Sequence, residues 1–194
     1  MTETVVSEHR KLLERSPAER EERGIGDDRL VEALLSVIEH GGREEKVIAD
    51  CTFPELDLDF RAVDSDNNYP VVFRNCTVAG FGNNGIYGSG PGTSGGAGGR
   101  VVVEGGLYRN NNIASVRVGS TDSVVRKVTV LHDEPIPDVE GGGSNGRGIW
   151  VREGGDNITI EDCDVTFTAD ADGATNPIII VPRDGADRYS RTAK

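Results

Sequence analysis

The sequence predicts an all-β solenoid, a right-handed parallel β-helix of about four to five coils with an N-terminal α-helical cap. After residue 42 the chain consists of short β-branched runs separated by Gly, Asn and Asp. These runs repeat, and no helix-length periodic segment separates them, which excludes a doubly wound α/β fold. A β-sandwich, which also uses short strands and Gly-rich turns, is the alternative.

Residues 1–42 are expected to form the helical cap. Leu12 and Leu13 lie in a charged stretch that Pro17 interrupts. A second helix is predicted to begin at Asp27 or Asp28, because apolar residues then recur at helical spacing. They are Leu30, Leu34, Leu35 and Ile38, and Gly41 and Gly42 follow them. Such a helix would cover the first coil and block end-to-end association. We assign residues 43–188 to the β-helix and residues 189–194 to a C-terminal tail.

Three columns of residues carry the repeat. The first column is Phe73, Val103, Val125 and Ile160. The second is Cys51, Cys76, Gly106, Val128 and Cys163, whose members lie 25, 30, 22 and 35 residues apart, and the third is Phe53, Val78, Tyr108, Val130 and Val165. A single coil buries too few of these side chains to offset the ordering of its backbone, so neighbouring coils are expected to share one core.

A second, shorter strand follows in most coils and is preceded by asparagine. The strands are expected at residues 86–87, 114–118, 149–152 and 177–181. Asparagine side chains at matching turns tolerate left-handed backbone and bind neighbouring backbone groups, so we expect a structural role for them.

The charge of the chain argues against several partners. Its net charge is −12, with 33 acidic and 21 basic residues, of which only Lys11, Lys46, Lys127 and Lys194 are lysines. This balance makes nucleic acid and anionic membranes poor partners, and it resembles that of halophilic archaeal proteins. No signal peptide or transmembrane run is evident, so a cytoplasmic location is expected. The three cysteines show no metal-binding spacing.

Several repeat motifs carry a family resemblance. Residues 75–87, 111–118 and 156–163 resemble right-handed β-helix repeat proteins of haloarchaea, in the pectate-lyase-like group. Residues 47–80 also look like pentapeptide-repeat proteins, through residues 49–53 and 73–77. The resemblance implies a solenoid fold and a carbohydrate-related role, since the group includes polysaccharide lyases, glycoside hydrolases and members with no known activity.

The candidate site lies on the outward face of the short strands. If Ile86, Ala114 and Ile149 point inward, alternation turns the residues after them outward. These are Tyr87, Ser115 and Trp150 in one row, with Ser89, Arg117 and Arg152 in the next. Aromatic rings stack on sugars and arginines bind carboxylates, so the row predicts binding of an acidic polysaccharide.

Catalysis by the same row is a further possibility. In a lyase, Arg117 or Arg152 would serve as the base, and Ca²⁺ would need several nearby acids. Asp133, Glu134 and Asp138, or alternatively Asp156, Asp162 and Asp164, could supply them. In the competing interpretation, the rings of Tyr87 and Trp150 pack under the loop of residues 133–147, and the arginines form ion pairs with acidic side chains. The chain would then be a structural or interaction module, or a truncated β-helix without activity. The sequence predicts no oligomeric state.

Overall fold

The fold is seen in a computed structural model that describes residues 3–13, 15, 17–26, 29, 32, 33, 36, 46–49, 52–54, 70–88, 98–138, 143–152 and 155–181. In these residues two short helices precede fourteen strands, and every strand pairing is parallel. The parallel pairing contradicts the β-sandwich alternative, whose sheets are antiparallel. No helix of the described residues is long and apolar enough to cross a bilayer.

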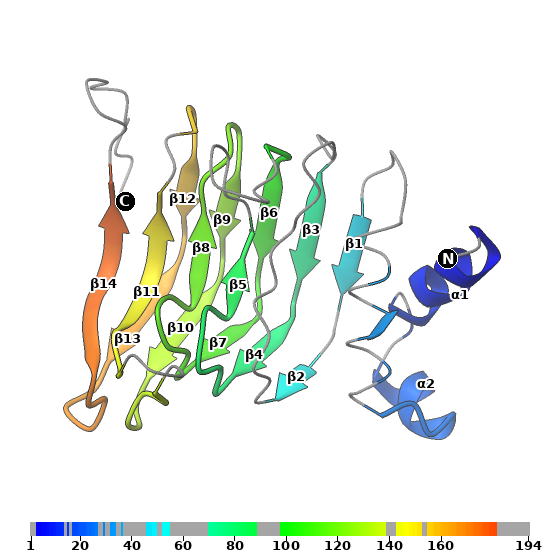
Figure 1. Ribbon diagram of the computed structural model, residues 1–194, viewed down its shortest axis with the longest axis horizontal. Helices are drawn as coiled ribbons and strands as arrows, with labels where there is room; N and C mark the ends of the chain where they lie inside the picture. The colour runs from blue at the N-terminus through cyan, green and yellow to red at the C-terminus, as the bar shows by residue number, and fades with distance from the viewer. Residues whose placement is uncertain are drawn as a thin grey trace.

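The helices lie at one end of the molecule (Figure 1). Helix α1 (Glu3–Leu13) buries Leu12 and Leu13, which belong to the same core cluster as Ile48 of the first strand. Helix α2 (Pro17–Glu22) begins at the proline, a position that tolerates a missing N–H. Residues 29, 32, 33 and 36 are also helical. The predicted stripe of Leu30, Leu34, Leu35 and Ile38 lies outside the described residues.

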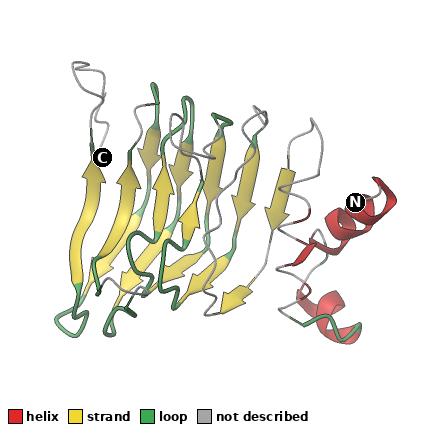
Figure 2. Cartoon of the chain, in the orientation of Figure 1, coloured by secondary structure: helices red, strands yellow, loops and turns green. Residues whose placement is uncertain are grey.

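The strands form three sheets, which we call A, B and C (Figure 2). Sheet A consists of β1 (Lys46–Ala49), β3 (Val71–Arg74), β6 (Val101–Glu104), β9 (Val124–Arg126) and β12 (Thr159–Glu161). Sheet B consists of β2 (Thr52–Pro54), β4 (Thr77–Ala79), β7 (Leu107–Arg109), β10 (Thr129–His132) and β13 (Asp164–Phe167). Sheet C consists of β5 (Ile86–Tyr87), β8 (Val116–Val118), β11 (Gly146–Val151) and β14 (Ala174–Ile180). From β3 onward, successive strands therefore enter sheets A, B and C in turn, an arrangement compatible with a β-helix-like solenoid.

The first and third predicted columns are confirmed by the strand register, whereas Cys51, of the second column, lies outside the described residues. In sheet A, Phe73 aligns with Val103, Val103 with Val125, and Val125 with Ile160. In sheet B the aligned residues are Phe53, Val78, Tyr108, Val130 and Val165. The side chains of Phe73, Val103 and Val125 have no exposed surface, so neighbouring coils bury them as the sequence predicts.

The corner between sheets A and B has the same backbone in four coils. Asn75, Gly105, Lys127 and Asp162 each adopt a positive φ, between 51° and 66°. Asn, Gly and Asp tolerate this left-handed conformation, whereas lysine rarely adopts it. The N–H groups of Asn75, Gly105 and Lys127 donate to the carbonyls of Glu104, Arg126 and Glu161 in the next coil. The corners are therefore stacked as regularly as the strands.

Asparagines bind the backbone near the corner between sheets B and C, as predicted. Asn111 is fully buried, and its side-chain oxygen accepts the N–H of Phe81 at 3.1 Å. Its amide nitrogen donates to the carbonyl of Val78 at 3.0 Å. Asn112 accepts the N–H of Asn145 at 2.8 Å in the following coil. The structural role is thus confirmed for these two residues.

Candidate functional site

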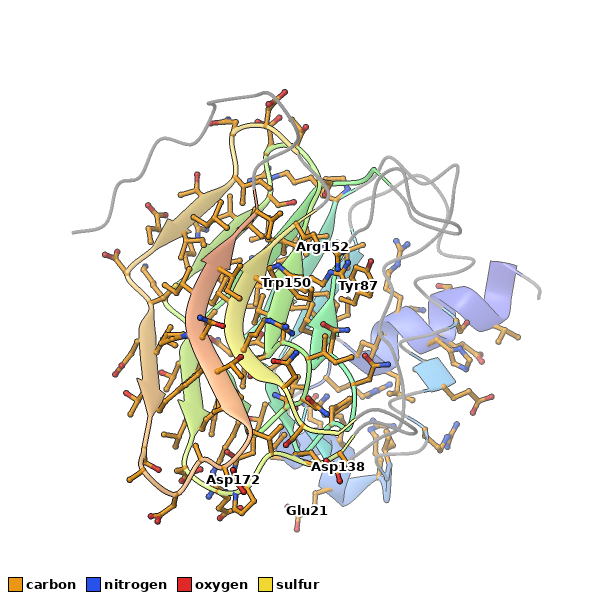
Figure 3. All side chains as sticks on the ribbon, turned by 60° about the vertical axis from the view of Figure 1, so that its left-hand side comes forward. Glu21, Tyr87, Asp138, Trp150, Arg152 and Asp172 are labelled. Atoms are coloured by element: carbon orange, nitrogen blue, oxygen red, sulfur yellow. The ribbon has the colours of Figure 1, made fainter. Side chains whose placement is uncertain are left out.

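The outward face of sheet C carries one continuous row of aligned side chains. Ile86, Val116 and Ile149 align with one another and are fully buried, so the residues after them point outward. The outward row is Tyr87, Arg117, Trp150 and Ile179. Figure 3 shows Tyr87, Trp150 and Arg152 on this face, whereas Asp138 and Asp172 lie toward the lower end of the strands.

The guanidinium of Arg117 lies between the two aromatic rings of the row. Its Cζ is 3.8 Å from the centre of the Tyr87 ring and 4.6 Å from that of Trp150. Arg147 and Arg152 approach the same indole, at 4.6 Å and 4.9 Å. Three guanidinium groups therefore surround one tryptophan, where the negative ring face attracts each cation. We call Tyr87, Arg117, Arg147, Trp150 and Arg152 the arginine–indole cluster.

The arginine–indole cluster is unevenly exposed. Tyr87, Arg117 and Trp150 are only 8%, 7% and 9% exposed, whereas Arg152 is exposed and Arg147 half-buried. The Trp150 indole N–H is buried and makes no hydrogen bond within the described part of the chain. A ligand from solvent would therefore meet Arg152 and Arg147 before the two rings.

Arg147 has an unusual electrostatic environment. Burial lowers its pKa, and the positive charges of Arg152 and Arg117 lower it further. Its Nη1 donates to the carbonyls of Ile113 at 3.0 Å and Asn145 at 3.3 Å, which fixes the side chain beside Trp150.

The outward face of sheet A carries paired opposite charges, unlike the outward face of sheet C. Its outward row is Arg74, Glu104, Arg126 and Glu161, in which opposite charges alternate. Oε2 of Glu104 lies 3.4 Å from Nε of Arg74, and Oε1 lies 3.1 Å from Nη2 of Arg126. The guanidinium of Arg126, and to a lesser extent that of Arg74, lowers the pKa of the Glu104 carboxyl. The outward row of sheet C holds no acidic residue at an aligned position.

Ser115 does not belong to the outward row, and the predicted register of β8 is wrong by two residues. The structure aligns Tyr87 and Trp150 with Arg117, so Val116 rather than Ala114 occupies the inward column. Ser115 is fully buried, and its hydroxyl lies 3.1 Å from Nε2 of His132 and 3.4 Å from the amide nitrogen of Asn111. Ser89, predicted in the second row, lies outside the described residues.

The buried Ser115–His132 contact was not predicted, because the two residues come from different sheets. The His132 ring is fully buried and lies 4.5 Å from the ring of Phe167. Burial lowers its pKa from 6.5 to about 4. Neither side chain has exposed surface, so no substrate reaches the pair and its role is structural. Arg147 was also missed, because it follows a register irregularity at Gly146 where alternation no longer predicts direction.

Two of the acidic residues considered for Ca²⁺, Asp133 and Glu134, bind an arginine instead. Asp133 accepts two bonds from Arg109, at 2.8 Å and 3.0 Å, and the Arg109 guanidinium lowers the pKa of this carboxyl. Glu134 binds the same guanidinium at 2.6 Å. Among the residues that the structure describes, no three His, Cys, Asp or Glu side chains group as metal ligands would.

The chain was compared with family models, curated proteins and solved structures, and none of them matches.

Proposed function

We propose that the chain is a right-handed parallel β-helix of the pectate-lyase-like type that binds an acidic polysaccharide through the arginine–indole cluster. The observation that carries this proposal is the gathering of three guanidinium groups on one indole in a chain with a net charge of −12. The gathering of guanidinium groups beside aromatic rings on sheet C supports a site for an anion.

The burial of the rings indicates which part of a glycan is recognised. Because Tyr87 and Trp150 are less than 10% exposed, face-to-face stacking of a sugar on either ring is limited. The rings instead orient the guanidinium groups, whose forked donors match carboxylate and sulfate oxygens. Recognition is therefore dominated by charge, and a neutral glycan should bind poorly.

The geometry of Arg117 favours binding over catalysis. A lyase base must be accessible to its substrate, yet two aromatic rings lie against this guanidinium. It is also only 7% exposed. We therefore assign Arg117 and Arg152 to anion binding rather than to catalysis.

The handedness is part of the proposal. Parallel strands of one sheet are joined by right-handed connections in about 98% of proteins. Neighbouring strands in sheets A, B and C are parallel, and each pair is joined by a crossover connection of the kind to which this rule applies. A right-handed coil is the arrangement that this rule favours.

The proposal is tested with a panel of glycans that differ in charge: a polyuronate, a sulfated polysaccharide and a neutral glucan. We expect binding of one or both acidic polymers and a loss of at least about tenfold in affinity, or about 1.4 kcal/mol, in Arg152→Ala. Trp150→Ala should weaken binding similarly, because the indole orients all three arginines. Arg74→Ala is the matched control, since it removes an exposed arginine from sheet A, and its affinity should equal that of the parent chain.

Two results would contradict the proposal. If no acidic glycan binds, or if Arg152→Ala and Arg74→Ala bind equally well, the arginine–indole cluster is not a glycan site. The chain would then be a structural or interaction module. Turnover of a polyuronate that disappears in Arg117→Ala would overturn the assignment of binding without catalysis.

A further inference from the structure

Among the described residues, the coil formed by β12, β13 and β14 leaves inward apolar side chains exposed at one end of the stack. In the inward column of sheet C, Ile86, Val116 and Ile149 have no exposed surface, whereas Ile178, which aligns with Ile149, is 46% exposed. The inward residues of the other two sheets show the same change. Ile160, Val165 and Phe167 are half-buried, although Val125, Val130 and His132 beneath them are fully buried.

The opposite end of the stack is closed. Leu12 and Leu13 of α1 are buried in one cluster with Ile48 of β1. Figure 1 shows the helices beyond β1 at this end and β14 at the other. Ile86 of β5, the first strand of sheet C, and Phe81, which precedes that strand, are also fully buried. Head-to-tail stacking of copies would have to displace this cover, so within the described part of the chain the end formed by β12, β13 and β14 is the one that a second copy can reach.

We propose that two copies of the chain associate end to end through this last coil, about a two-fold axis. The partner must offer aliphatic side chains at the spacing of three adjacent sheets, and a second copy of the same end does so. A two-fold contact uses the same surface on both copies and closes after two. Pro177 lies in the edge strand β14 and lacks an N–H, so the contact relies on side chains more than on a continued backbone ladder.

Residues 182–194 are a poorer occupant of this end. They contain no Val, Ile, Leu or Phe, and Tyr189 is their only large apolar-bodied residue. The columns that they would have to continue consist of Val, Ile and Phe. This segment therefore lacks the side chains that the open columns require.

The charge of the last coil makes the association dependent on salt. Residues 156–181 contain no Lys or Arg, and their acidic residues are Asp156, Glu161, Asp162, Asp164, Asp170 and Asp172. Two such ends repel each other in dilute buffer. Molar salt shortens the range of this repulsion from about 10 Å to about 3 Å, while contact between the apolar columns is retained. The dimer is therefore expected to strengthen as salt is added, opposite to a contact made by ion pairs.

Sedimentation velocity of the full chain, at about 0.1 M and about 3 M KCl, measures this association. We expect a concentration-dependent dimer that is tighter in high salt. Ile178→Lys should weaken the dimer by at least about tenfold. The matched control is Thr166→Lys, which adds the same charge to an exposed residue of β13, between the inward residues Val165 and Phe167. This control should dimerise like the parent chain.

A measurement without substitutions guards against a variant that fails to fold. Hydrogen exchange of the parent chain should slow at β12, β13 and β14 when its concentration rises through the dimer midpoint, and remain unchanged at β3 and β4. A monomer at both salt concentrations, equal dimers of the two lysine variants, or growth beyond dimers would each overturn the proposal. So would a chain cut after Val181 that dimerises when the full chain does not, because residues 182–194 would then cover the end.

Discussion

Lowering the pH from 7 to 5 should destabilise the protein through His132. The imidazole is fully buried against Phe167 and within hydrogen-bond distance of Ser115. Burial lowers its pKa from 6.5 to about 4. The unfolded chain therefore takes up a proton at this histidine at a higher pH than the folded chain does. Stability from this group is complete above about pH 6.5 and is lost as the pH falls toward 4.

The size of the effect follows from the two pKa values. A difference of 6.5 − 4, or about 2.5, corresponds to about 3 kcal/mol at 1.36 kcal/mol for each pKa unit. About 2 kcal/mol of this is lost by pH 5, since the unfolded histidine is then almost fully protonated and the folded one mostly neutral. The pKa values of Asp133 and Glu104 are lowered below 3.8 and 4.5, so both carboxyls remain largely ionised in the interval from pH 7 to pH 5.

Urea unfolding at fixed ionic strength, at pH 7 and pH 5, compares the parent chain with His132→Gln. Glutamine carries no charge at either pH, and its terminal amide can contact Ser115 as the imidazole does. The free energy of unfolding of the parent chain should fall between the two pH values by about 2 kcal/mol more than that of the variant. Equal falls in the two proteins would refute the reasoning, because the buried histidine would then not be the group that titrates.

Two further substitutions test the packing of the coils. The Tyr108 hydroxyl is fully buried without a hydrogen-bond partner in the described residues. Tyr108→Phe should therefore leave the free energy of unfolding in urea unchanged or raise it by up to about 1 kcal/mol. A decrease of more than about 1 kcal/mol would instead show that the hydroxyl has a hydrogen-bond partner. Gly106 has a φ of 87°, and a Cβ there would overlap the Cys76 carbonyl, whereas a Cβ at Gly143, with a φ of 66°, meets nothing within 4 Å. Gly106→Ala should therefore cost at least about 3 kcal/mol and Gly143→Ala only about 1 to 2 kcal/mol, and equal losses would contradict the close stacking of the corners.

The columns of sheets A and B could be predicted because each coil repeats the same order of residue types around its corner. Phe73 and Val78, for example, flank Asn75 and Cys76 as Ile160 and Val165 flank Asp162 and Cys163. The interval between the two apolar residues is fixed by the corner, so only one alignment satisfies both columns. The strand register then follows from sequence alone.

The register of sheet C could not be fixed in this way. Ala114, Val116 and Val118 are all apolar and fully buried, and a strand has a period of two, so a shift by two residues leaves the inward pattern intact. The preceding asparagines also do not fix it, because the turns before β5, β8 and β11 differ in length. Arg117 therefore occupies the position predicted for Ser115. Contacts between sheets, such as Ser115 with His132, leave no periodic signal in the sequence.

The recurring left-handed corner also bears on how such a chain changes length. Because Asn75, Gly105, Lys127 and Asp162 turn the backbone in the same way, a segment copied from one corner to the next carries compatible junctions at both of its ends. The intervals between these corners, 30, 22 and 35 residues, differ only in what lies between the junctions. Gene segments that encode whole coils could thus be duplicated or deleted. The loops of such coils could diverge in length and sequence while the corner conformation is kept.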